Sequence, residues 1–227
     1  FFEDVGRAGE AIVAMDSYAP LSLVEVMDRV TVSAVEDLAR MDLDTSAAAM
    51  VLVQSDAQDA ARVIEACEGL CTKAGARNVI ATADPEEGQL LLRARRMAVP
   101  ALEAKGTTLL DDVVVPKPAI PEMMERIRKT GERHQLVIGT FGHGGDGNLH
   151  PTIVFDGRDA ASQAKAFEAF DEILRDAIRL GGTITGEHGV GTLKRGYLPT
   201  LGEAELGIMR RIKASFDPNG ILNPGKA

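Results

Sequence analysis

The hydrophobic residues of this chain follow a strand-like period of two in some segments and a helical period of about 3.6 in others. This pattern predicts strands and helices in succession along the chain. Short runs of apolar and β-branched residues predict strands, at 21–27, 48–54, 78–82, 109–115, 136–141 and 151–155. Longer segments with apolar residues at helical spacing predict helices, at 6–15, 31–40, 56–73, from 84 onward, 120–134, 159–180 and 203–216.

The order of these elements predicts an α+β fold. Strand–helix–strand units recur with short connections, which favours an antiparallel, ferredoxin-like sheet with helices packed on one face. Periodicity alone leaves a flavodoxin-like α/β sheet open. A last helix and a turn-rich tail complete the chain. We therefore expect one domain over residues 1–200 and a separate C-terminal helix and tail over residues 201–227.

Composition and charge narrow the class of protein. The 227 residues are 45% hydrophobic and 26% charged, which is ordinary for a globular chain. The net charge of −9, with no evident basic face, argues against a nucleic-acid partner. Cys67 and Cys71 are expected to be reduced thiols, which favours a reducing compartment. We expect a cytoplasmic location, with peripheral attachment at the inner face of the membrane as the alternative.

The first of two glycine-rich stretches with candidate chemistry runs from Gly139 to His150. His143 and His150 flank a Gly-Gly-Asp-Gly turn between two predicted strands. On one straight strand, an offset of seven would place the two imidazoles on opposite faces. A hairpin through the glycines brings both to the base of the loop, where they can form half of a metal site. A simple turn with polar residues at its ends is the alternative interpretation.

The second stretch, Gly181 to Gly191, contains Glu187 and His188. Adjacent side chains generally point in different directions, so these two residues are expected to have different roles. Glu187 with His143 and His150 would make a three-ligand metal site with open positions, an arrangement suited to catalysis. His188 is then left as a candidate base.

Three motifs together resemble the C-terminal half of FAD-linked oxidases of the vanillyl-alcohol-oxidase superfamily. They are GHGGDGNLH, then GEHGVG followed by Lys194, and finally FDPNGILNPGK. The family includes glycolate oxidase large subunits, D-lactate dehydrogenases and D-2-hydroxyglutarate dehydrogenases. The resemblance implies that this chain is the substrate or cap domain of a flavoprotein. It also implies that FAD is bound mainly by a domain absent from this chain, and that residues 201–227 dock on that domain.

The resemblance further implies an activity, the oxidation of a D-2-hydroxy acid by metal-assisted deprotonation and hydride transfer to FAD. It assigns a divalent cation, with Zn, Mn or Fe as candidates, to His143, His150 and Glu187. His188 would accept the hydroxyl proton. Without the FAD domain, the chain is expected to be inactive as an oxidoreductase.

The resemblance also places a substrate-carboxylate arginine in the helix that begins near residue 84. Arg95 fits that position best, and Arg96 is its rival. An arginine suits the role because its planar fork binds a carboxylate through two parallel hydrogen bonds. Some hydroxyglutarate-type members carry a basic residue near position 110, where this chain has Leu110, and Asn where Thr152 stands. These differences favour a monocarboxylate such as D-lactate or glycolate.

Four further residues are candidates for contact with substrate or cofactor. Asn148 is assigned to substrate, although bracing of the hairpin is the simpler role. Lys194 is also assigned to substrate, with a plain surface charge as the alternative. Tyr197 and Asn223 match family positions that face the active site or the flavin, and they are assigned to cofactor binding.

The expected partners follow from the same resemblance. They are a small 2-hydroxy acid, the FAD-binding domain of the parent protein, and an electron-acceptor protein or quinone, and a homodimer is left open. Two other functions compete with the oxidase. One is a metal-binding or interaction domain without catalysis, and the other is a metal-dependent hydrolase that uses His188 as base.

Overall fold

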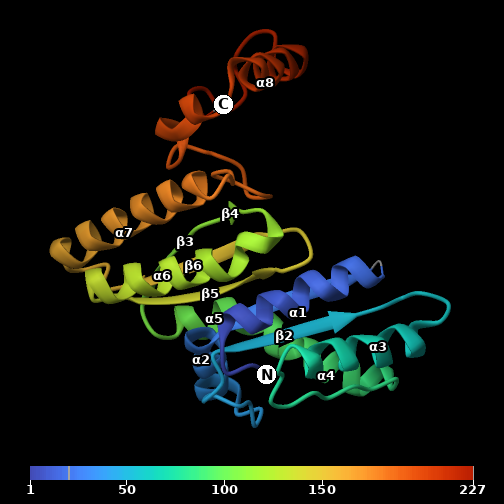
Figure 1. Cartoon of the computed structure of the whole chain (residues 1–227). Coiled ribbons are helices and arrows are strands. Elements are labelled where there is room, and N and C mark those ends of the chain that lie inside the picture. Colours follow the sequence, from blue (N-terminus) through green and yellow to red (C-terminus); the bar gives the residue numbers. More distant parts are fainter. Residues whose placement is uncertain (20, 227) are drawn as a thin grey trace.

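The computed structural model describes residues 1–19 and 21–226 and contains one six-stranded sheet, helices on its two faces and a C-terminal helical arm (Figure 1). The strands are β1 (Leu23–Asp28), β2 (Ala49–Gln54), β3 (Thr107–Leu110), β4 (Val113–Val114), β5 (Val137–His143) and β6 (Asn148–Phe155). The helices are α1 (Val5–Tyr18), α2 (Arg29–Ala39), α3 (Ala60–Lys73), α4 (Pro85–Arg96), α5 (Ala98–Glu103), α6 (Ile120–His134), α7 (Ala160–Arg179) and α8 (Glu203–Phe216), with short 3-10 helices η1 (Lys117–Ala119) and η2 (Arg195–Thr200). None of the described helices is both long and apolar enough to cross a membrane.

The sheet is antiparallel throughout its described strands. The strand order is β2-β1-β5-β6-β3, and β4 pairs with β6 beyond the end of β3. This topology confirms the predicted α+β class and excludes the parallel flavodoxin-like alternative. The two strands at the centre, β5 and β6, are those that carry the first glycine-rich motif.

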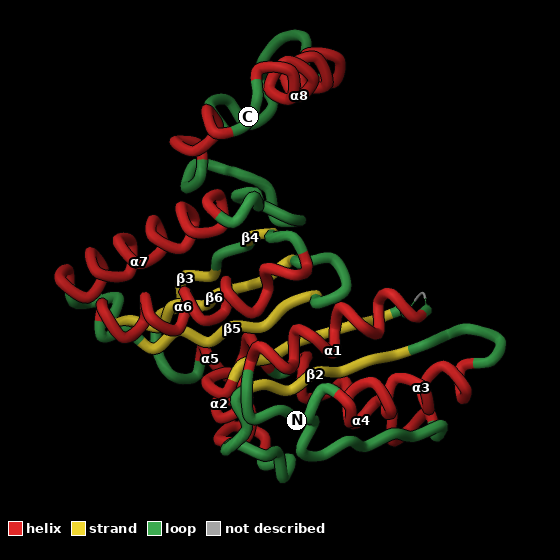
Figure 2. Tube along the Cα trace, viewed as in Figure 1, coloured by secondary structure: helices red, strands yellow, loops and turns green. Residues whose placement is uncertain are grey.

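Helices cover both faces of the sheet, so the expectation of helices on one face alone was incomplete (Figure 2). Helices α1, α6 and α7 pack on the face that includes Val26 of β1. Helices α2 and α5 pack on the other face, where Met27 of β1 and Phe141 of β5 are buried against Leu102. Successive strand residues point to opposite faces. Glu25 lies on the same face as Met27, so this face of β1 is not uniformly apolar in the sequence and its burial under helices was not predicted.

The strand expected at residues 78–82 is absent from the described chain. The backbone from Asn78 to Asp84 is irregular, and Ile80 is exposed. The N-terminal segment lies next to β2 instead, where Phe2 forms isolated bridges to Ala49 and Ala76. Residues 78–82 pair with no described strand.

The arm formed by α8 and the residues after it extends away from the sheet (Figure 1). Leu206 is the one buried residue among those of α8, all of which are described, while Phe216 is 81% exposed. The division of the chain at residue 200 and the docking of residues 201–227 on another domain both stay predictions. Ala227, at the end of that segment, lies outside the described residues.

The hairpin of β5 and β6 requires close approach between its two strands. A Cβ atom on Gly142 would lie 2.2 Å from the carbonyl oxygen of Asn148 and 2.8 Å from Cα of Leu149. In the turn, Gly147 has a φ of 82°, and a Cβ there would lie 2.0 Å from the carbonyl oxygen of Val115. The glycines are therefore needed for packing as well as for the turn.

Substitution of Gly142 by Ala is expected to destabilise the chain by about 1–3 kcal/mol, because the added methyl group meets backbone that cannot move aside cheaply. Gly69→Ala in α3 is the matched control, since its Cβ would meet nothing within 4 Å. That change should be neutral or stabilising by roughly 0.5–1 kcal/mol. Urea unfolding of the two variants measures the difference, and equal stabilities would contradict the packing argument.

Candidate active site

His143 and His150 lie side by side on one face of the sheet. The register of β5 and β6 pairs Phe141 with His150 and His143 with Asn148, so both imidazoles project from the same side. Their ring centroids are 5.3 Å apart, with the ring planes at 87°. The hairpin interpretation is therefore confirmed, and the odd sequence offset does not separate the two side chains.

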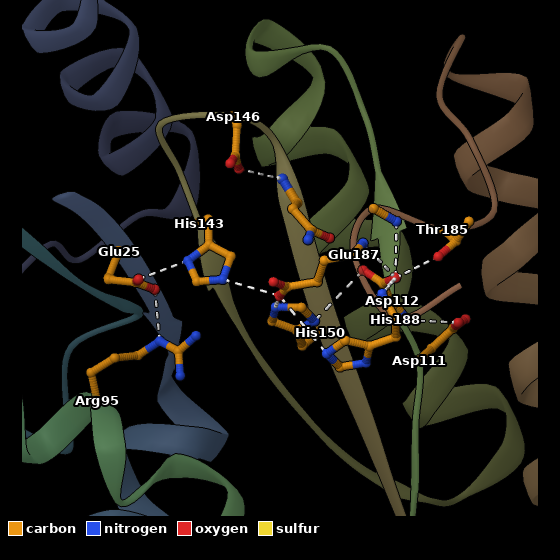
Figure 3. Close-up of polar contacts among 12 residues, drawn as sticks. Glu25, Arg95, Asp111, Asp112, His143, Asp146, His150, Thr185, Glu187 and His188 are labelled. Carbon is orange, nitrogen blue, oxygen red and sulfur yellow. Dashed lines mark hydrogen bonds and ion pairs between the residues drawn. The ribbon is translucent and has the colours of Figure 1, made fainter. Parts of the chain in front are cut away.

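Glu187, in the loop after α7, places its carboxylate between the two imidazoles (Figure 3). Its Oε1 lies 3.3 Å from Nε2 of His143 and 3.2 Å from Nε2 of His150. One potential ligand atom from each residue lies within 4.8 Å of the other two. The side chain of Glu187 is 52% exposed, whereas that of His150 is 4% exposed. The structure thus brings the three predicted metal ligands together and leaves the Glu187 side open.

The chemistry of this donor set fits a divalent transition metal. Burial, followed by the charge of His143, lowers the pKa of His150 to about 4, so its imidazole is neutral and can donate a lone pair. Its Nδ1 lies 3.9 Å from Oδ1 of Asp112. Both atoms are buried and have no hydrogen-bond partner among the described residues. A carboxylate behind the outer nitrogen of a metal-binding histidine is a recurrent arrangement.

Asp112 fixes the loop that carries Glu187 and His188. Its Oδ2 accepts hydrogen bonds from the hydroxyl of Thr185 at 2.7 Å and from the backbone N–H groups of Gly186, Glu187 and His188 at 2.9, 3.1 and 2.9 Å. Burial alone would raise the pKa of Asp112, but these hydrogen bonds outweigh it and lower the pKa to about 2. The ionised carboxylate thus holds three consecutive amides in place.

The position of Asp112 follows from a break in the strand pairing. β3 and β4 pair with β6 in one continuous register, and Asp112 falls between them, across from His150. Pro151 has no N–H to donate at this point of β6, which interrupts the ladder. The interruption leaves the side chain of Asp112 beside the loop rather than within a regular strand.

His188 stands beside the three candidate ligands. Its ring stacks on that of His150, with centroids 5.2 Å apart and planes at 12°. Its Nε2 lies 3.8 Å from Oε1 of Glu187, and half of its side chain is exposed. The structure therefore gives the candidate base an accessible imidazole next to the candidate metal site, and separates its position from that of Glu187.

Arg95 enters the site from the last turn of α4, while Arg96 does not. Nε of Arg95 donates to Oε2 of Glu25 at 2.7 Å, and its guanidinium lies 4.5 Å from the centroid of the Phe141 ring. Arg96 instead bonds to the exposed side chain of Gln89. The geometry thus favours Arg95 over its rival.

Glu25 also contacts the first candidate ligand. Its Oε1 lies 2.7 Å from Nδ1 of His143, and the two residues are direct partners in the register of β1 and β5. Sequence reasoning missed Glu25 and Asp112 as parts of the site. The available signal was an acidic residue inside an apolar strand run, LVEVM for Glu25 and LLDDVVV for Asp112.

Lys194 is buried in a network of the chain's own acceptors, so it is not a plain surface charge. Its Nζ lies 2.6 Å from Oδ1 of Asp111, 2.6 Å from the carbonyl oxygen of Asp112 and 2.7 Å from that of Ile184. An ammonium group has three donors, so all are used. Lys194 therefore joins the base of the loop to the β3–β4 segment, and its contact with substrate stays a prediction.

Asn148 packs under the second motif. The amide is so close that a Cβ on Gly186 would lie 2.5 Å from Nδ2 of Asn148. Its Oδ1 is buried and has no hydrogen-bond partner among the described residues. The bracing role agrees with this packing, and the contact with substrate stays a prediction.

The two residues assigned to the cofactor lie outside the cluster of His143, His150 and Glu187. Tyr197 packs beside the core that includes α7, and its hydroxyl lies 3.5 Å from the carbonyl oxygen of Asp171. Asn223 belongs to the C-terminal arm and has a φ of 46°. Their contact with a flavin stays a prediction.

Comparison with known proteins gives the family context of this site. The model of the family "FAD linked oxidases, C-terminal domain" matches residues 1–227. The glycolate oxidase subunit GlcD of Bacillus subtilis is 40% identical over 231 residues, which cover 99% of this chain and 49% of that protein. The mitochondrial D-lactate dehydrogenase [cytochrome] of Arabidopsis thaliana is 31% identical over 227 residues, which cover 96% of this chain and 39% of that protein. The chain thus spans about half or less of the length of these relatives.

Solved structures share the fold at low sequence identity. The 4-ethylphenol oxidase of Gulosibacter chungangensis matches with a TM-score of 0.65 at 15% identity, over all of this chain and 52% of that one. A p-cresol methylhydroxylase matches with a TM-score of 0.64 at 14% identity, over all of this chain and 51% of that one. With the family model matched over its whole length and a relative of 40% identity, the chain belongs to the family of C-terminal domains of FAD-linked oxidases.

Proposed function

We propose that this chain is the substrate-binding and catalytic part of a flavoprotein that oxidises a D-2-hydroxy acid, with D-lactate or glycolate favoured. The observation that carries the proposal is the convergence of His143, His150 and Glu187, with His188 and Arg95 beside them, in a member of an FAD-linked oxidase family. Relatives named as a glycolate oxidase subunit and as D-lactate dehydrogenases support the substrate class.

His143, His150 and Glu187 would hold a divalent cation, with Zn, Mn or Fe as candidates. When bound, such a cation supplies Lewis-acid polarisation of a substrate oxygen. The chain prepares this site in two ways. Burial keeps His150 neutral, and the hydrogen bonds to Asp112 hold the backbone of Glu187 where its carboxylate reaches both imidazoles.

His188 is the proposed base for the hydroxyl proton. Stacking on the buried His150 fixes the plane of its ring, and its backbone N–H is fixed by Asp112. An imidazole can accept a proton near neutral pH, and general-base catalysis contributes about 100- to 10,000-fold to a rate. The half-exposed ring leaves room for a substrate on its open side.

Arg95 is the proposed partner of the substrate carboxylate. Glu25 accepts a hydrogen bond from Nε of Arg95 only. The two terminal nitrogens of the Arg95 guanidinium are left to bind a carboxylate. The contact with Phe141 and the bond to Glu25 fix the direction of the guanidinium. A substrate held at the carboxylate would present C2 in one orientation.

The flavin would be bound mainly by another domain of the same parent protein, and hydride acceptance would be its chemistry. Apart from the buried Leu206, large apolar side chains of α8 and of the tail are exposed in this chain and would dock on that domain; they are Ile208, Met209, Ile212, Phe216, Ile221 and Leu222. Tyr197 and Asn223 would then approach the cofactor. An electron-acceptor protein or quinone would reoxidise the flavin, and the chain by itself would not oxidise substrate.

The metal site is tested by His143→Ala and His150→Ala in a Zn²⁺ titration against a chromophoric chelator. Each change removes a ligand, so affinity should fall by more than the roughly 10- to 100-fold that loss of a ligand's hydrogen-bond partner causes. His134→Ala is the control. His134 is the last residue of α6, where its ring bonds to Glu172 of α7 and not to the three candidate ligands. Unchanged affinity in both site variants would remove the metal from the proposal.

The base is tested by His188→Gln in the FAD-containing parent protein. Metal content should be retained, while reduction of the flavin by D-lactate or glycolate should slow by about 100- to 10,000-fold. Stopped-flow absorbance of the flavin measures this step, and it also separates an oxidase from a hydrolase. A near-normal rate of reduction would exclude His188 as the base.

The carboxylate partner is tested by comparing Arg95→Met with its neighbour Arg96→Met in the same parent protein. Loss of a charge-assisted pair should lower kcat/KM for the hydroxy acid by roughly 10- to 100-fold in the Arg95 variant. The Arg96 variant should match the wild type, since Arg96 bonds to exposed Gln89. Equal losses in both variants would contradict the assignment.

A further inference from the structure

The carboxylate of Glu25 joins two parts of the site that come from distant segments of the chain. Its Oε1 lies 2.7 Å from Nδ1 of His143, and its Oε2 accepts from Nε of Arg95 at 2.7 Å (Figure 3). Its side chain is 7% exposed. We infer that Glu25 is a positioning residue that sets the ring of His143 for metal binding and the guanidinium of Arg95 for substrate binding. This inference rests on the proposed function.

The first part of the argument is the bonding capacity of a carboxylate. The guanidinium of Arg95 is always protonated and can only donate. Nδ1 makes the shorter of the two carboxylate contacts of the His143 ring, 2.7 Å to Glu25 against 3.3 Å from Nε2 to Glu187, so Glu25 is the partner that holds a proton at Nδ1. A ring protonated at Nδ1 can present the lone pair of Nε2 to a cation. Glu25 therefore selects the tautomer that a metal at this site requires.

The second part is the need for a carboxylate rather than an amide. Two donors, Nδ1–H of His143 and Nε–H of Arg95, converge on Glu25 from two directions. A glutamine has one carbonyl oxygen and one NH₂ group. The oxygen can accept a hydrogen bond from one of the two neighbours, but the NH₂ group, itself a donor, would then face the N–H of the other. Replacement by Gln therefore preserves size and burial but cannot satisfy both neighbours.

The third part is the rigidity of the surrounding structure. Glu25 and His143 are direct partners in the register of β1 and β5, so the strand pairing sets the reach between their side chains. Arg95 is held on the other side by the ring of Phe141. His150 differs from His143, because no described residue bonds its Nδ1. Orientation by a formed hydrogen bond is thus a property of the His143 half of the site.

The test compares Glu25→Gln with Asp176→Asn in the 227-residue chain. Asp176 is a matched control because its side chain is also 7% exposed and it bonds to Arg126 and Arg179, between α6 and α7. Zn²⁺ affinity should fall by about 10- to 100-fold in the Glu25 variant and stay unchanged in the control. Nitrogen-15 NMR of the His143 ring should show loss of the Nδ1–H tautomer in the Glu25 variant alone.

A second change separates positioning from general loss of structure. Arg95→Met removes one of the two donors, so the amide introduced by Glu25→Gln can turn its oxygen to His143 in the double variant. Adding Arg95→Met to Glu25→Gln should therefore restore Zn²⁺ affinity and the Nδ1–H tautomer. A variant that had simply lost its fold would not be rescued by a second substitution.

The outcomes distinguish the inference from the proposed function. If His143→Ala and His150→Ala both leave Zn²⁺ affinity unchanged, the proposed metal site is wrong and the inference falls with it. If His143→Ala weakens Zn²⁺ binding but Glu25→Gln does not, the inference alone is overturned. Absence of rescue in a folded double variant would also overturn it.

Discussion

The pairing of β5 with β6 is the constraint on which the site depends. It is antiparallel, it places His143 opposite Asn148, and it tolerates no Cβ at Gly142. A shift of one residue along either strand would move one imidazole to the opposite face of the sheet. The tight pairing of β5 with β6 therefore does more than stabilise the fold. It places His143 and His150 where both can contact the carboxylate of Glu187.

Acidic and imidazole groups alternate across this face of the sheet. The order is Glu25, His143, Glu187, His150 and Asp112, drawn from strands β1, β5 and β6, the loop after α7 and the β3–β4 segment. The two outer carboxylates are buried, and the middle one is half exposed. A cation bound here would have buried carboxylates behind its histidine ligands on the protein side. On the solvent side, beside Glu187, it would have open coordination positions.

The parts of this arrangement that are local in sequence were predictable from turn chemistry and periodicity, namely the bounds of α6 and α8 and the hairpin between β5 and β6. The three candidate ligands came from glycine-rich motifs that resemble a known family. The rest depends on contacts that no local pattern records. Glu25 meets His143 across 118 residues, and Asp112 meets the amide of His188 across 76. The strand predicted at 78–82 is absent, and the edge of the sheet beside Ala49 is occupied by Phe2.

The contact between Asn148 and Gly186 has a consequence for any attempt to recombine this protein with a relative. The side chain of Asn148 fills the space that a Cβ at position 186 would need. The two motifs therefore form one steric unit, although 38 residues of chain separate these positions. A chimera with its crossover between them would join halves shaped for different neighbours, whereas a crossover outside them would transfer the unit intact.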